Sequence, residues 1–251
     1  MKIAYCLHGQ PRQYKMGYEH ISKFVEKYDV DFFFHTWHSD TLEYFDYSTY
    51  TIRKLEAYKV DRDAITNLLS CYKPIEYMVE EPKHFDIPDN VYSSVAYKNS
   101  SWSNIIPKNV NNLFSQMYSR EKVKDIFQKH AHKYDIVISS RFDYMKDIYL
   151  DLSQIDPSKL YVGSLHRPRY IFPDTLLVCN PKMFCNIANM YSNFNQLINI
   201  NRQIHGEPVN LVMEGILFFQ FFDVGYTIDD VIFTDDIPLD GWNIIAFNSI
   251  P

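Results

Sequence analysis

The sequence predicts an α/β protein built on a single open sheet that is mainly parallel, has helices on both faces and becomes mixed in its second half. Two observations lead to this prediction. The apolar runs are continuous rather than alternating, as in strands that are buried on both faces. Segments with helical periodicity separate these runs, and that order is typical of a layered α/β domain.

The first half alternates strands with helices. Each predicted strand is a short apolar run, and each predicted helix carries apolar residues on one face. The strands are 2–7, 30–36 and 75–79, and the helices are 17–28 and 61–72, the second opened by Asp61 as its cap.

A long excursion precedes the second half. Residues 80–108 are polar and contain three prolines, which predicts a surface segment. A single long helix over 109–132 then leads into a strand at 135–140. Beyond it we expect strands near 159–163 and 175–179, helices near 181–198 and 209–224, and short extended runs near 226–234.

The overall composition limits the classes of function that the protein can have. The chain has 251 residues, of which 46% are hydrophobic and 22% are charged, typical of a folded globular protein. A net charge of −6 predicts no nucleic-acid partner. We expect a cytoplasmic protein, because no stretch is apolar enough to span a bilayer and the four cysteines lack a disulfide or CxxC spacing.

Two charges end one of the apolar strands. In YDIVISSRFDYMKD, residues 134–147, the run Ile136–Ile138 is followed by Arg141 and Asp143. Ligands of open α/β sheets bind beyond the carboxyl ends of the strands. There, a carboxylate can hold a divalent cation and a guanidinium can bind a phosphate through two hydrogen bonds. An Arg–Asp ion pair that caps the strand is the alternative.

The loop after the first strand favours a ligand site. HGQPRQY, residues 8–14, places Gly9 where the backbone can approach a ligand, fixes the turn with Pro11 and adds the cation of Arg12. A solvated turn is the alternative. Neither GxGxxG nor GxxxxGK[ST] occurs, so the sequence supports neither a dinucleotide fingerprint nor a P-loop.

Several short motifs, in order, resemble those of GT-A-fold glycosyltransferases. They are KIAYCLHGQPRQY, VDFFFHTW, the helix segment Gln116–Ser119, YDIVISSRFD, PDTLLVCNP and the late helix with Glu214. The pattern is similar to that of WavE-type lipopolysaccharide-synthesis and viral glycan-building transferases and spans about residues 2–225. It implies one GT-A-like, Rossmann-type domain over 1–251, with a nucleotide-binding half, 1–145, and an acceptor half, 146–251.

The resemblance implies a nucleotide-diphosphate-sugar donor and a divalent cation, Mn²⁺ or Mg²⁺. Asp143 matches the last acid of the family's Asp-x-Asp metal motif, whereas Arg141 replaces the first. A lone carboxylate with donor phosphates and water would then hold the metal, or Arg141 and Arg12 would neutralise the leaving diphosphate without one. The predicted donor-binding residues are His8, Gly9, Gln10, Arg12, His35, Trp37, Gln116, Arg141 and Asp143.

A transferase that inverts the sugar needs a base for the acceptor hydroxyl, a glycan or another alcohol. Asp174, which precedes a predicted strand, and Glu214, within an otherwise apolar helix, are the two candidates. A buried carboxylate is costly unless it is paired or used. A turn acceptor for Asp174 and an ion pair for Glu214 are the alternatives.

The segment HTWHSD, residues 35–40, only loosely resembles a metal-hydrolase spacing, and we do not predict a metal there. His35 and Trp37 would instead line a base or ribose pocket, where an aromatic face stacks on a nucleobase.

Three functions remain open from the sequence. The first is glycosyl transfer from a nucleotide-sugar, with inversion or retention undecided. The second is nucleotidyl transfer, which would release pyrophosphate. The third is a non-catalytic module of the same fold that binds a nucleotide or a glycan.

Overall fold

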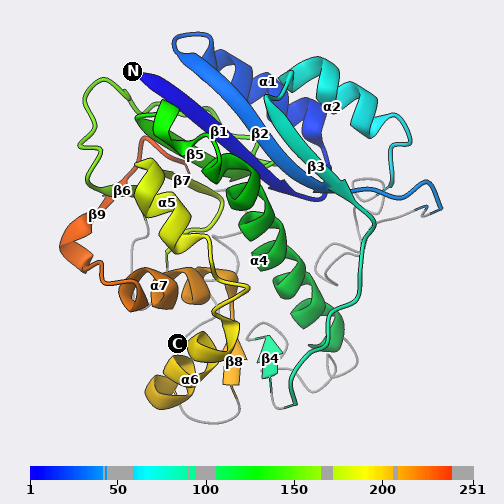
Figure 1. Cartoon of the computed structure of the whole chain (residues 1–251), viewed down its shortest axis with the longest axis vertical. Coiled ribbons are helices and arrows are strands. Elements are labelled where there is room, and N and C mark those ends of the chain that lie inside the picture. Colours follow the sequence, from blue (N-terminus) through cyan, green and yellow to red (C-terminus); the bar gives the residue numbers. More distant parts are fainter. Residues whose placement is uncertain are drawn as a thin grey trace.

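In the computed structural model, which describes residues 1–41, 43, 59–89, 91–93, 106–164, 172–205 and 209–238, seven strands form one sheet. The strand order is β3-β2-β1-β5-β7-β6-β9 (Figure 1). The bounds are β1 Lys2–Gly9, β2 Asp29–Trp37, β3 Glu76–Glu80, β5 Ile136–Arg141, β6 Leu160–Gly163, β7 Leu176–Cys179 and β9 Val231–Thr234.

The first four strands of that order are parallel, whereas β7 runs antiparallel to both β5 and β6. The predicted fold class, a mainly parallel open sheet with a mixed second half, is therefore confirmed. The parallel strands end at one side of the sheet, which we call the carboxyl edge: Gly9, Trp37, Glu80 and Arg141 are the last residues of β1, β2, β3 and β5.

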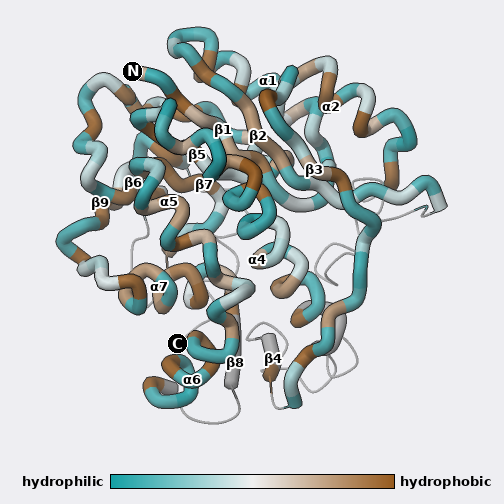
Figure 2. The backbone as a smooth tube through the Cα atoms, viewed as in Figure 1, coloured by the Kyte–Doolittle hydropathy of each residue, from teal (hydrophilic) through white to brown (hydrophobic). Residues whose placement is uncertain are grey.

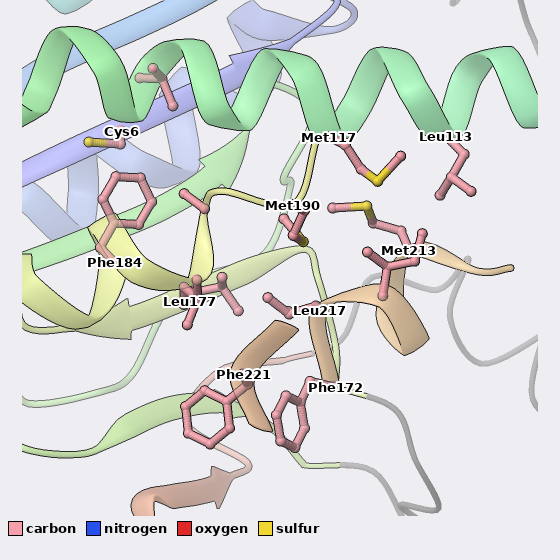
Figure 3. Close-up of a cluster of buried hydrophobic side chains, with 14 of the residues drawn as sticks. Cys6, Leu113, Met117, Phe172, Leu177, Phe184, Met190, Met213, Leu217 and Phe221 are labelled. Atoms are coloured by element: carbon pink, nitrogen blue, oxygen red, sulfur yellow. The ribbon is translucent and has the colours of Figure 1, made fainter. Parts of the chain in front are cut away.

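The alternation of side chains along β1 explains the two layers. Ile3, Tyr5 and Leu7 point to one face, where they pack with helices α1 and α2, and Ala4 and Cys6 point to the other. The second face is covered by α4 and by helices of the second half (Figures 1 and 3). The helices are α1 Tyr14–Val25, α2 Ala64–Tyr72, α4 Ile106–Gln128, α5 Pro181–Ile187, α6 Phe194–His205 and α7 Met213–Asp223, with the 3₁₀ turns η3 Ala131–Lys133 and η4 Ile228–Asp230.

Brown, hydrophobic segments concentrate along the central strands (Figure 2), and each face of the sheet carries its own buried cluster. Figure 3 shows how the second-face cluster joins distant segments: Met117 of α4 lies above Leu177 of β7 and Leu217 of α7. The described helices include none that is both long and apolar enough to cross a bilayer.

Several details of the elements differ from the sequence prediction. Helix α1 begins at Tyr14 rather than 17, directly after Gln13, whose φ is 49°. The N-cap of α2 is Asp63, and Asp61 instead accepts a hydrogen bond from the Asp63 amide through Oδ1. The predicted helix 181–198 is two helices, α5 and α6. The predicted helix 209–224 is strand β8, Val209–Leu211, followed by α7.

The excursion predicted over 80–108 lies partly outside the described residues, at 90 and 94–105. Its described part is not confined to the surface: Phe85 is 5% exposed and Val91 is 6% exposed. Val91 begins β4, Val91–Ser93, which pairs in parallel with β8. All four cysteines are free, and Cys6 and Cys179 are buried, whereas Cys71 and Cys185 are half-buried.

Candidate functional site

The site lies where the direction of chain winding reverses. From β1 the chain proceeds to β2 and β3 on one side, and β5 then joins β1 on the other side. Ligands of open α/β sheets bind at such a switch point, because the loops beyond the two strands separate there. The loop after β1 carries Arg12, and the turn after β5 carries Asp143.

Two guanidiniums converge on one carboxylate at this point. Arg12 Nη2 donates to Asp143 Oδ2 at 2.9 Å, and Arg141 Nε donates to Asp143 Oδ1 at 2.8 Å. The exposed fractions of the three side chains are 20%, 14% and 18% for Arg12, Asp143 and Arg141, so the group reaches solvent. Burial opposes ionisation, but the charges of Arg141 and Arg12 outweigh it and hold the pKa of Asp143 below its ordinary value.

The backbone of the first loop is fixed by hydrogen bonds to neighbouring elements. Gly9 has a φ of 101°, a conformation that glycine adopts readily. Its amide donates to Ser119 Oγ at 2.7 Å, and its carbonyl accepts from Thr36 Oγ1 at 2.9 Å. The Gln10 carbonyl accepts from the Arg12 amide at 2.8 Å. These contacts orient the loop that presents Arg12.

A second glycine sets the distance between α1 and the turn after β5. A Cβ added to Gly17 would lie 1.9 Å from the carbonyl oxygen of Phe142. Helix α1 therefore packs directly on the backbone of the turn that contains Asp143. This contact brings the start of α1, which follows Arg12, against that turn.

Both predicted base candidates lie beside the cations. Asp174 precedes β7, whose first residue pairs with Ser140 of β5, and Glu214 lies in the first turn of α7. The Phe172 amide donates to the Glu214 carbonyl at 3.1 Å, which joins the two segments. Burial and the neighbouring Asp174 carboxylate raise the pKa of Glu214 to about 8, although Arg141 and Arg120 act in the opposite direction.

Arg120 is the buried centre of this charge cluster, and we did not predict it. The side chain is fully buried, and its Nη2 donates to the Asp174 carbonyl at 2.6 Å. Its Nε donates to His8 Nε2 at 3.1 Å. Burial lowers the pKa of Arg120 to about 10, which leaves it cationic at neutral pH.

The bond from Arg120 fixes the state of His8. Because Nε2 accepts a hydrogen bond, the proton of the neutral ring lies on Nδ1, which is buried and has no partner among the described residues. Burial and the nearby charges of Arg120 and Arg141 lower the pKa of His8 well below its ordinary value. His8 is therefore a neutral part of the core beneath the site.

The predicted pocket residues His35 and Trp37 are buried. His35 Nδ1 lies 2.7 Å from Ser119 Oγ and its Nε2 lies 2.8 Å from Glu80 Oε2. Trp37 is 2% exposed and stacks on Tyr118, with ring centroids 5.5 Å apart. In this conformation neither ring offers an open face to a nucleobase. His35 instead connects the end of β3 to the first loop through Ser119.

The arrangement around Asp143 does not fit a divalent cation. Mn²⁺ and Mg²⁺ take several oxygen ligands, but each Asp143 oxygen already accepts a hydrogen bond from an arginine. Among the described residues there is no group of three or more acids, histidines or cysteines that could hold a metal. Each unit of like charge 4 Å away costs about 4 kcal/mol at an effective dielectric constant near 20. Two adjacent guanidiniums therefore strongly disfavour a cation here.

The structure thus brings together most of the predicted site residues, from both halves of the chain. Gln116 lies half-buried on α4. Arg120 and Ser119 were missed because they resemble the solvent face of a helix. A signal was present: Arg120 lies three residues after Met117, on the stripe whose next members are Val123 and Phe127, which are all buried.

No protein-family model matches the chain, and no curated protein matches it. Solved structures do resemble it. A galactosyltransferase, LgtC, in complex with donor and acceptor sugar analogues has 12% sequence identity over 93% of this chain and 73% of its own, with a TM-score of 0.46. An active-site mutant of LgtC has 13% identity over 93% and 72%, with a TM-score of 0.42. A protein from Desulfovibrio desulfuricans G20, provisionally described as a nucleotide-diphospho-sugar transferase, has 9% identity over 93% and 79%, with a TM-score of 0.38.

Proposed function

We propose that this protein is a glycosyltransferase that moves a sugar from a nucleotide-diphosphate-sugar to an acceptor hydroxyl, in glycan or polysaccharide synthesis. The observation that carries the proposal is the convergence of Arg12 and Arg141 on Asp143 at the switch point of the sheet, where the charge of Arg141 also acts on a buried acid, Glu214. Such a site has cations for a diphosphate and a proton acceptor for the incoming hydroxyl.

The reaction places opposite demands on the two sides of the site. The bond between the sugar C1 and the diphosphate oxygen breaks, and negative charge develops on the leaving nucleoside diphosphate. Guanidiniums that already lie at the site stabilise that charge. Arg12 and Arg141 are brought to the same point by their shared hydrogen bonds to Asp143.

On the acceptor side, the hydroxyl oxygen forms a new bond to C1 and gives its proton to a carboxylate. Glu214 is suited to this role, because a base works best when its pKa lies near the operating pH, and its pKa is raised to about 8. Asp174, its buried neighbour, raises that pKa and is the second candidate for the base.

The test is incubation of the whole protein with UDP-, GDP- and TDP-sugars, with a panel of acceptor glycans, and measurement of released nucleoside diphosphate. Release that falls in Glu214→Gln, but not in Glu26→Gln at the exposed end of α1, supports transfer. Binding without release would favour the non-catalytic module, and pyrophosphate as the product would favour nucleotidyl transfer. The absence of both nucleotide binding and nucleotide release would overturn the proposal.

A further inference from the structure

We propose that Arg12 and Arg141 replace the divalent cation in binding the donor diphosphate, and that Asp143 is the internal counter-ion that the diphosphate displaces. This inference rests on the proposed function and concerns how the same site holds its donor.

Both carboxylate oxygens of Asp143 are engaged by arginines. Oδ2 accepts from Arg12 and Oδ1 accepts from Arg141, so the carboxylate bridges the loop after β1 and the end of β5. A carboxylate has the same charge and acceptor geometry that a phosphate presents to arginine. Asp143 thus occupies the position between the guanidiniums that a phosphate group would take.

The charges of the three side chains also favour a diphosphate. Arg12 and Arg141 carry two positive charges, and the Asp143 carboxylate between them carries one negative charge. A diphosphate carries more negative charge than one carboxylate and has more acceptor oxygens, so it can engage both guanidiniums at once. The exposure of all three side chains, 14–20%, gives the ligand access to them.

Arg141 is the last residue of β5, where the resemblance implies the first acid of the metal motif. Arginine keeps its charge at all accessible pH values and repels a divalent cation. The neighbouring Arg120, fully buried behind the group and charged at neutral pH, adds to this repulsion.

The experiment is isothermal titration of UDP, GDP, TDP and inorganic pyrophosphate into the full chain, once with EDTA and once with MnCl₂. Binding is expected with comparable affinity in both. Arg12→Met and Arg141→Met should each weaken it by about 10-fold or more, as expected for a lost charge-assisted hydrogen bond. Lys129→Met is the matched control, because Lys129 pairs with Glu76 at the opposite edge of the sheet.

The decisive variant is Asp143→Asn. A counter-ion model predicts that binding in EDTA is kept or tightened, because the competing negative charge is gone. A metal-ligand model predicts the opposite, with binding only in MnCl₂ and its loss in Asp143→Asn. That second pattern would overturn this inference and leave the proposed function standing, whereas no binding of any probe in either condition would overturn both. Circular dichroism of each variant verifies that it is folded.

Discussion

Arg12 and Asp143 are 131 residues apart in the sequence and are joined by a hydrogen bond of 2.9 Å across the switch point of the sheet. One residue follows β1 and the other follows β5. The bond therefore connects the two strands that border the candidate site, and it depends on the elements that hold each loop.

Gly17→Ala should lower the free energy of unfolding by about 1–3 kcal/mol, as in overpacked cores. The new methyl group would lie 1.9 Å from the Phe142 carbonyl oxygen, and backbone cannot move aside as a flexible side chain can. Urea unfolding measures the change. Met16→Ala, an exposed neighbour, should change stability by less than about 0.5 kcal/mol. Equal effects of the two substitutions would show that the α1 contact is not tight.

The rate of transfer should rise with pH up to about 8 and then level off. Below that pH Glu214 is mostly protonated in the free protein and cannot accept a proton, because its pKa is raised to about 8. Glu214→Gln should remove this rise and lower kcat by about 100-fold or more. Initial rates across pH measure both effects. An unchanged profile in the variant would assign the base elsewhere.

Asp174→Asn should move the same pH profile toward acid. The Asp174 carboxylate raises the pKa of Glu214, so its neutralisation lowers that pKa and ionises the base earlier. The measurement is the ratio of the transfer rate at pH 6 to the rate on the plateau, which should rise in the variant. Loss of all activity with no residual pH dependence would instead make Asp174 the base.

Arg120→Met should move the profile toward alkali, because the Arg120 charge lowers the pKa of Glu214. It should also destabilise the protein by about 3 kcal/mol or more, since it removes one partner of a buried charge cluster. Arg120→Lys retains a charge and should shift the profile less. A stability loss without any shift of the pH profile would give Arg120 a structural role only.

Ser119→Ala should cost about 1–3 kcal/mol of stability, because it leaves the buried Gly9 amide without its hydrogen-bond acceptor. His35 Nδ1 also loses its neighbour. Ser115→Ala, one turn earlier on α4 and half-buried, is the matched control. Thermal unfolding measures both. A loss no larger than that of the control would show that the hydrogen bond to the first loop contributes nothing.

The sequence predicted the parallel half of the fold well, because each strand there is a local apolar run and each helix has a local period. It did less well where a boundary depends on distant contacts. The break between α5 and α6 is held by Glu121 of α4, which accepts hydrogen bonds from the amide and the hydroxyl of Ser192. Strand β8 exists because it pairs with β4, over 100 residues earlier.

In the candidate site, too, the sequence predicted what depends on local patterns and missed what depends on distant contacts. That Arg12 and Asp143 lie together follows from the rule that parallel strands share their carboxyl edge. Tertiary packing decides two further contacts. One is the hydrogen bond between Arg141 and Asp143, and the other is the interaction of Asp174 with Glu214. Arg120 is hidden in the sequence for a physical reason: a buried arginine in a helix is rare, and only its neighbours Met117 and Val123 indicate the buried face.

The most direct test of the account is a crystal structure of the protein with a bound nucleoside diphosphate, taken from whichever of UDP, GDP and TDP binds in titration. We predict that the diphosphate oxygens accept hydrogen bonds from the guanidiniums of Arg12 and Arg141, with Asp143 displaced from between them. A nucleotide bound away from both arginines, with the Asp143 bridge intact, would contradict it.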